Sequence, residues 1–211
     1  MEVASLPELQ SFRLVSADNP GCGVSPYDGN HPLNIDGVVE LMEGLVTHLG
    51  LNRFRLVGGS MGGLVELLYA EQNPSKIAGF VNVEGNLAPQ DCMFSRRDSP
   101  FLFTFRKGRV STDQEGPGRQ NRPVSARNLQ APEKANPRAY YDYSFQTVEY
   151  SDRGNLLDRF LSLPAPKCFL YGSQNCHLSY LQRLRESECG GVEVPNANLP
   201  IVVFNIHQRR I

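Results

Sequence analysis

The sequence predicts an α/β fold in which a mostly parallel sheet is flanked by helices. Apolar runs at residues 54–57, 77–83 and 167–171 have the length and the β-branched or aromatic content of buried strands. Segments with helical periodicity lie between these runs, and the clearest of them covers residues 35–49. Strands that alternate with helices along a chain are typical of a parallel sheet covered by helices.

The other elements follow from local patterns. Residues 12–17 predict a strand that leads into a turn rich in glycine and proline. The helix at 35–49 has Asp36 near its start and Gly50 just past its end, as helix termini favour. Further helices are expected at three segments, 61–71, 155–163 and 178–186, and a last strand at 191–194.

The composition indicates an ordinary globular protein. The 211 residues carry a net charge of -1, with 20% charged and 40% hydrophobic residues. This balance provides no basic field for nucleic acid, and no run approaches the roughly 18 apolar residues of a membrane span. The N-terminus lacks the basic and apolar regions of a secretory leader. Five cysteines without a C-x-x-C pair indicate reduced thiols, so we expect a cytoplasmic protein.

The most informative stretch is Gly58-Gly59-Ser60-Met61-Gly62, between the strand at 54–57 and the helix that follows. It has the pattern G-x-S-x-G, in which a sharp strand-to-helix turn lifts a serine hydroxyl above the end of a parallel sheet. Such a turn needs strained backbone angles, and glycines let the strand and helix pack closely around it. The alternative is a glycine-rich turn whose serine only caps the helix.

A second motif, Asp18-Asn19-Pro20-Gly21-Cys22-Gly23-Val24-Ser25, precedes the first by about 35 residues. Together the two motifs resemble the α/β-hydrolase superfamily, which carries a D-x-P-G-x-G-x-S segment before its nucleophile turn. The resemblance covers residues 12 to 195. It implies hydrolysis of an ester, amide or related acyl bond, with Ser60 as the nucleophile that forms an acyl-enzyme. It also implies that the Met61 N–H stabilises the oxyanion.

The acid that orients the catalytic histidine is expected to be Glu84, which directly follows the strand at 77–83. In the superfamily this acid most often follows the next strand, but that place here holds Gln174 or Asn175. An amide cannot carry the negative charge that stabilises an imidazolium. Some members carry the acid at the earlier place, and the Val83-Glu84-Gly85-Asn86 run resembles theirs. The alternative is a solvated glutamate in a turn.

The catalytic histidine is the least determined residue. The superfamily delivers it after the last strand, where this chain has Leu199. The next histidine along the chain is His207, in a tail that is first apolar and then basic, and His177 is the second candidate. A chain without a catalytic histidine is the third possibility. His48 and His31 are expected to be surface or loop residues.

Three segments are expected: a hydrolase core with the nucleophile turn (1–87), a cap insertion with an irregular stretch around 107–138 (88–155), and the continued core with an atypical tail (156–211). Aromatic residues of the cap would line a pocket for an apolar small molecule. No metal-ligand spacing or dinucleotide motif is present, so no metal or organic cofactor is expected. The oligomeric state is left open.

The resemblance also implies two departures from an active enzyme. The chain starts too late to include the family's third strand, whose loop supplies the second oxyanion donor. In addition, no histidine stands at the place where the family carries its catalytic histidine. Two alternatives to an active hydrolase therefore remain: a hydrolase fold that serves as a binding module, or a shortened gene product.

Overall fold

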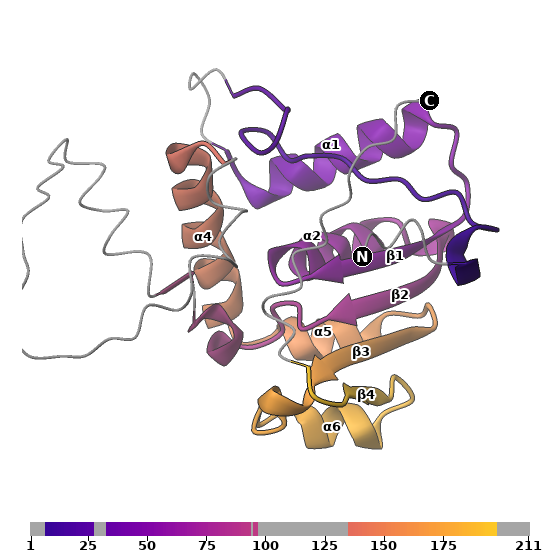
Figure 1. Ribbon diagram of the computed structural model, residues 1–211, viewed down its shortest axis with the longest axis vertical. Coiled ribbons are helices and arrows are strands. Elements are labelled where there is room, and N and C mark those ends of the chain that lie inside the picture. Colours follow the sequence, from indigo (N-terminus) through magenta and orange to yellow (C-terminus); the bar gives the residue numbers. More distant parts are fainter. Residues whose placement is uncertain (1–6, 28–32, 94, 97–134, 198–211) are drawn as a thin grey trace, which may run out of the picture.

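The computed structural model describes residues 7–27, 33–93, 95–96 and 135–197. Its sheet has four parallel strands in the order β1-β2-β3-β4 (Figure 1). Their bounds are Phe54–Gly59, Ile77–Val83, Lys167–Gly172 and Gly191–Val194. The fold class and the four predicted strands from residue 54 onward are confirmed. Strands β2 and β4 have the expected bounds. Strand β1 is two residues longer than expected, and β3 is one residue longer.

Five α-helices are fully described: α1, α2, α4, α5 and α6, with bounds Ile35–His48, Met61–Gln72, Pro137–Asp152, Leu156–Ser162 and Leu181–Glu186. Short 3-10 turns occur at Pro7–Leu9, Pro74–Lys76, Pro89–Cys92 and Ser173–Asn175. The helices predicted at 35–49, 61–71 and 155–163 are confirmed, whereas α6 is shorter than expected. Among the described residues, no helix has both the length and the apolar character needed to cross a membrane.

The core lies on one face of the sheet. Phe80 on β2 packs edge-on against Phe160 of α5, with 5.5 Å between ring centroids, and Phe169 on β3 packs against Tyr180 at 5.8 Å. The strand register places Leu56, Phe80 and Phe169 on this same face. Figure 1 shows α2 and α5 behind the strands on that side. Helix α1 packs mainly against α2.

The strand predicted at residues 12–17 is wrong. This segment has no strand pairing, and Phe12, Leu14 and Val15 are about half exposed. An apolar run becomes a strand only when a neighbouring strand accepts its hydrogen bonds. Within the described residues, β1 is the last strand on this side of the sheet and pairs only with β2. The apolar run therefore lies on the surface without strand structure.

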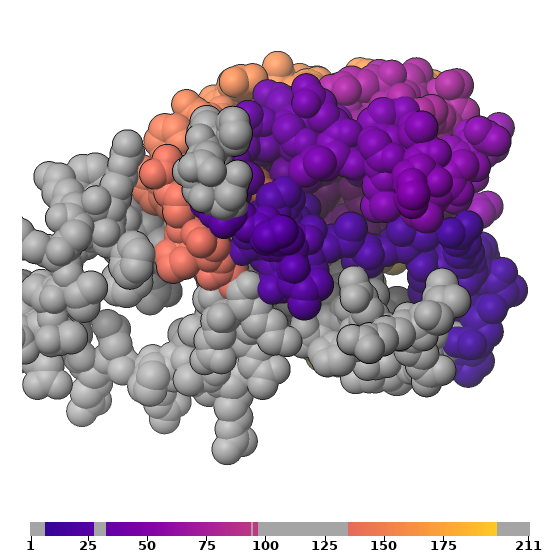
Figure 2. Space-filling view, turned by 90° about the horizontal axis from the view of Figure 1, so that it is seen from above, coloured from indigo at the N-terminus to yellow at the C-terminus, as the bar shows by residue number. Residues whose placement is uncertain are grey.

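Helix α4 was not predicted, and it joins the N-terminal part of the molecule to the expected cap. Tyr143 Oη donates a hydrogen bond to the Pro20 carbonyl at 3.1 Å. Gln146 spans the start of α1, because its Oε1 accepts from the Ile35 N–H at 2.8 Å and its Nε2 donates to the Leu33 carbonyl at 2.7 Å. Figure 2 shows α1 and α4 side by side. Residues 97–134, most of the expected cap, lie outside the described residues.

Candidate active site

Ser60 occupies a strained backbone position between β1 and α2. Its φ of 50° and ψ of -126° lie outside the conformations that residues with a Cβ readily adopt. The serine is exposed, and its side chain makes no capping hydrogen bond to α2. The alternative in which Ser60 is a helix cap is therefore wrong. The turn presents an exposed hydroxyl at the start of α2, where the Met61 N–H has no acceptor one turn earlier in the helix.

The close contacts in this turn are made by Gly58 and Gly63. A Cβ on Gly58 would lie 2.8 Å from the backbone carbon of Gly62, and one on Gly63 would lie 2.8 Å from the Cα of Gly85. Gly62 itself has no atom within 4 Å of such a position among the described residues. Of the glycines in the sequence pattern, Gly58 is thus required by packing and Gly62 is not. Gly63 provides the second close approach.

A carboxyl group is buried beneath the turn. Oε2 of Glu66 has no solvent contact and no hydrogen-bond partner among the described residues, although the rest of this side chain is partly exposed. Burial raises the pKa of Glu66 well above its usual value, and the backbone of Val57 opposes this shift only in part. Burial thus disfavours a negative charge on Glu66 behind Ser60.

Glu84 lies beside Ser60 at the carboxyl edge of the sheet. Gly59 pairs with Val83 in the β1–β2 register, so the two residues follow adjacent strands at the same level. Adjacent strands are about 4.8 Å apart. Glu84 also has a positive φ of 44°. The third non-glycine residue with positive φ in the described chain is Asn196, two residues after β4. The positive-φ residues other than glycine in the described part of the chain thus all lie at this edge, and strained backbone of this kind often occurs at functional sites.

The Glu84 carboxylate is held by the segment after β3. Its Oε1 atom accepts hydrogen bonds from the Gly172 N–H at 2.8 Å and from Asn175 Nδ2 at 2.7 Å. The Glu84 N–H donates to the Leu170 carbonyl at 2.9 Å. Glu84 is only partly exposed. The alternative of a freely solvated glutamate does not fit these contacts.

A second carboxyl group, Asp91, lies close to Glu84. Asp91 Oδ2 accepts from the N–H groups of Leu87 and Ala88, each at 2.8 Å, and Oδ1 accepts from Tyr180 Oη at 2.8 Å. Burial raises the pKa of Asp91 to about 6, and the charge of Glu84 adds a smaller increase. These contacts connect the turn after β2 to the segment before α6. Sequence reasoning missed Asp91 because its side-chain partner, Tyr180, is 89 residues away in the chain.

Two buried asparagines complete the underside of the site, and both were missed. Asn82 is fully buried within β2, and its Oδ1 accepts from the Gly85 N–H at 2.7 Å. The Asn86 N–H donates to the Ser60 carbonyl at 3.3 Å. Buried amides are costly unless they are hydrogen-bonded. An asparagine inside the apolar run 77–83 was the available signal of a polar contact at this strand end.

The described histidines are both exposed, and one of them is near the site. His177 follows the turn Ser173–Asn175, two residues after the asparagine that contacts Glu84. His48 is at the end of α1, as expected for a surface residue. His207 and His31 lie outside the described residues. The structure thus brings Ser60, Met61 and Glu84 to one edge, and among the described histidines only His177 belongs to a loop at that edge.

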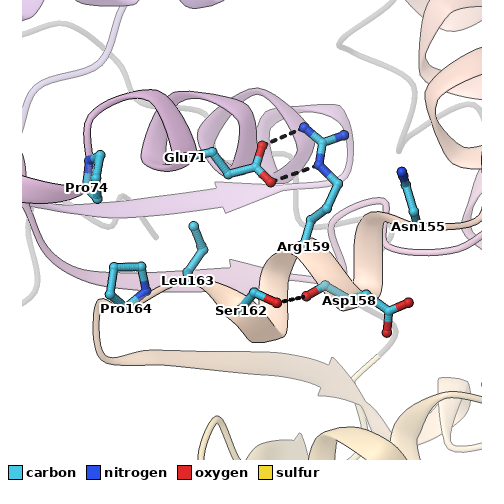
Figure 3. A pocket seen from close by; sticks show the side chains of 8 residues that line it. All are labelled: Glu71, Pro74, Asn155, Asp158, Arg159, Ser162, Leu163 and Pro164. Atoms are coloured by element: carbon cyan, nitrogen blue, oxygen red, sulfur yellow. Dashed lines mark hydrogen bonds and ion pairs between the residues drawn. The ribbon is translucent and has the colours of Figure 1, made fainter.

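Neither a metal site nor the described pocket competes with this edge. Within the described ranges, no group of three or more potential ligands could hold a metal ion. A pocket of about 400 Å³ lies between the end of α2 and α5, at the opposite end of α2 from Ser60. Figure 3 shows Arg159 and Glu71 paired through two contacts in this pocket, at 2.8 and 2.5 Å. Glu71 and Arg159 thus pair with each other, and none of the residues at the candidate edge lines this pocket.

Comparison with solved structures identifies the fold. A structure from a study of carboxylesterases of the thaumarchaeon Nitrososphaera gargenis has 14% identity and a TM-score of 0.64, over 88% of this chain and 72% of that chain. A thermophilic esterase from Thermogutta terrifontis has 20% identity and a TM-score of 0.58, over 85% and 70%. An esterase from Exiguobacterium antarcticum has 14% identity and a TM-score of 0.57, over 84% and 70%.

Sequence comparison assigns the family. No curated protein shows significant sequence similarity to this chain. A family model described as the alpha/beta hydrolase fold matches residues 2–175, which is most of the chain. The chain therefore belongs to the α/β-hydrolase fold family, as its two motifs suggested.

Proposed function

We propose that the protein is a serine hydrolase that cleaves an ester, amide or related acyl bond through an acyl-enzyme at Ser60. The observation that carries this proposal is the backbone of Ser60, whose strained angles hold an exposed, uncapped hydroxyl above the sheet. Strain of this kind costs about 1 to 3 kcal/mol and persists where function requires it. The esterases with similar folds support an ester as the first substrate class to test.

In the proposed reaction, Ser60 Oγ attacks the carbonyl carbon while a histidine takes the hydroxyl proton. The carbonyl oxygen becomes an oxyanion next to the Met61 N–H. The histidine then protonates the leaving group, and water hydrolyses the acyl-enzyme by the same steps. Glu84 stabilises the imidazolium and fixes its orientation. None of these steps calls for a metal or organic cofactor.

We assign the base first to His207 and second to His177. His207 lies beyond the last described strand, further along the chain than the place where the family delivers this residue, whereas His177 belongs to an exposed loop next to Glu84. The two assignments are separable by substitution. Loss of the base removes the activation that makes a neutral serine nucleophilic.

We further propose that residues 88–155 form a cap over the site and that the substrate is an apolar small molecule. Support comes from Tyr141 and Phe145 of α4, whose rings stack with centroids 6.2 Å apart, Phe145 being half exposed. Tyr143 has a different role, because it is buried and bonded to the Pro20 carbonyl.

The test is intact-mass labelling with a fluorophosphonate, which phosphonylates an activated serine. We expect one adduct per chain on the wild-type protein, none on Ser60→Ala, and strong slowing in either His207→Ala or His177→Ala. Ser179→Ala is a matched control, because Ser179 is an exposed serine of the β3–α6 segment. It should label like wild type.

A cooperatively folded wild-type protein without an adduct would contradict the proposal. It would support the binding module instead, and saturable ligand binding without covalent capture would identify it. A protein that fails to melt cooperatively would point to the shortened gene product. An adduct that survives Ser60→Ala would assign the nucleophile to another residue.

A further inference from the structure

We propose that Asn175 is a positioning residue that fixes the carboxylate of Glu84 from the turn after β3. The inference rests on the proposed function, in which Glu84 orients the catalytic histidine. Asn175 itself does not touch the substrate. It acts through Glu84, and its effect on the reaction should therefore vanish when Glu84 no longer carries a carboxylate.

The contacts define which carboxylate oxygen is held and which is available. Asn175 Nδ2 and the Gly172 N–H both donate to Oε1 of Glu84, at 2.7 and 2.8 Å. Two donors on one oxygen fix the rotation of the carboxylate as well as its position. Oε2 accepts no hydrogen bond from the part of the chain that the structure describes. It is the atom that can accept an imidazole N–H.

Glu84 needs such support more than a shorter acid would. A glutamate side chain has one more rotatable bond than an aspartate, and the backbone of Glu84 has the unusual φ of 44°. The Glu84 N–H is bonded to the Leu170 carbonyl, so the backbone and the side chain are both anchored to the β3 segment. Without Asn175, the Gly172 N–H alone would hold the carboxylate. The carboxylate could then rotate about this one hydrogen bond.

The other charged group near Glu84 does not compete for this donor. Asp91 receives its hydrogen bonds from Leu87, Ala88 and Tyr180. Burial is the main cause of the raised pKa values of Asp91 and Tyr180, and the charge of Glu84 adds a smaller increase to each, so these groups are close enough to sense it. Asn175 is neutral and adds a donor without adding another negative charge.

This arrangement explains why an amide occupies a place where the family resemblance suggested an acid. A carboxylate at position 175 would lie within hydrogen-bond distance of Glu84, and two such groups cannot both ionise. An amide at this place donates its N–H to the acid. The amide at position 175 and the acid at position 84 thus belong together, because the amide holds the acid in place.

The experiment measures the rate of fluorophosphonate labelling against pH for four proteins: wild type, Asn175→Ala, Glu84→Gln and the double variant. We expect Asn175→Ala to slow labelling by about 10- to 100-fold, as the loss of an outer-shell partner does at other sites. Glu84→Gln should slow it by about 10³-fold or more. The double variant should be no slower than Glu84→Gln.

The pH profile separates a positioning role from a structural one. A fixed carboxylate stabilises the imidazolium, so its loosening should move the midpoint of the labelling profile to lower pH. Asn175→Ala should shift the midpoint in the same direction as Glu84→Gln. Gln174→Ala is the matched control, because it removes an exposed amide from the same turn. Its rate and midpoint should equal those of the wild type.

Each outcome decides the inference. Wild-type rate and midpoint in Asn175→Ala would overturn it while leaving the proposed function in place. Independent, multiplicative effects of the two substitutions would overturn it too, because Asn175 would then not act through Glu84. A wild-type protein that takes no label would overturn the proposed function, and the inference with it.

Discussion

At the scale of single residues, the strained backbone of Ser60 lowers the stability of the protein while it presents the hydroxyl that the proposed function needs. Its φ of 50° disfavours any residue with a Cβ, and its side chain provides no cap that would offset this cost. We expect Ser60→Gly to be more stable than Ser60→Ala by about 1 kcal/mol. Both variants lack the hydroxyl, so their difference isolates the Cβ. Urea unfolding of the two variants measures it, and equal midpoints would show that the turn is not strained.

Asp91 makes the stability of the protein depend on pH. Its pKa is raised to about 6 by burial, above the usual value near 3.8. The folded state therefore holds this proton more tightly than the unfolded state does, and the free energy of unfolding falls as pH rises from about 4 to about 6. The expected loss is on the order of 2 kcal/mol, reduced from the full shift because Asp91 is partly exposed.

Asp91→Asn should remove this portion of the pH dependence. Its unfolding free energy, measured in urea between pH 4 and 7, should lack the fall that the wild type shows between pH 4 and 6. The comparison with wild type cancels the titration of all other carboxyl groups. Asp158→Asn is the control, since Asp158 forms an exposed ion pair with Arg183. Identical slopes in wild type and Asp91→Asn would contradict the burial argument.

At the scale of elements, the junction of β1 and α2 depends on one of two neighbouring glycines. A Cβ on Gly63 would meet the backbone of Gly85 at 2.8 Å, whereas a Cβ on Gly62 would meet no described atom within 4 Å. Gly63→Ala should therefore cost about 1 to 3 kcal/mol through overpacking. Gly62→Ala should be neutral or stabilise α2 by up to about 1 kcal/mol, because alanine favours helix.

Thermal unfolding of these two variants provides a matched pair. The substitutions are chemically identical and adjacent in α2, so helix propensity contributes equally to both. The difference between their stabilities measures the contact with Gly85. A Gly63→Ala variant as stable as Gly62→Ala would mean that the start of α2 and the turn after β2 can separate without cost.

The elements also show what a sequence can predict. The β2 and β4 strands and the helix α1 follow from local periodicity and end close to the expected residues. The run at 12–17 has the same local pattern but forms no strand, because pairing requires a partner strand. Helix α4 escaped prediction because its buried face includes polar residues, such as Thr147 and Ser151, which dilute the periodic signal.

The candidate site was predictable to a similar extent. Ser60 and Glu84 could be found because each directly follows a recognisable strand, and parallel strands end at one edge. The bond between Glu84 and Asn175 could not be found, because it joins positions 91 residues apart and depends on how the loop after β3 turns. Contacts of this kind are determined by the tertiary structure rather than by local pattern.

At the scale of the whole molecule, the described helices pack on one face of the sheet, and part of the other face is accessible. Val57 and Val192 are 58% and 47% exposed, on the two outermost strands. The register places both on the face opposite Phe80, in line with Val81 and Leu170. Exposed apolar sheet surface, together with a strand edge that has no partner among the described residues, favours association between molecules.

We expect this face to promote self-association, and charge introduced on it to oppose association. In the double variant Val57→Lys/Val192→Lys, the sedimentation coefficient should begin to rise only at a protein concentration at least several-fold higher than for the wild type. The double variant should still unfold cooperatively. Leu41→Lys is the control, because Leu41 is 57% exposed but lies on α1, away from this face. If the control reduced association as much as the double variant, general surface charge rather than the sheet face would be the cause. A wild-type sedimentation coefficient that does not change with concentration would show that this face is not adhesive in the intact chain.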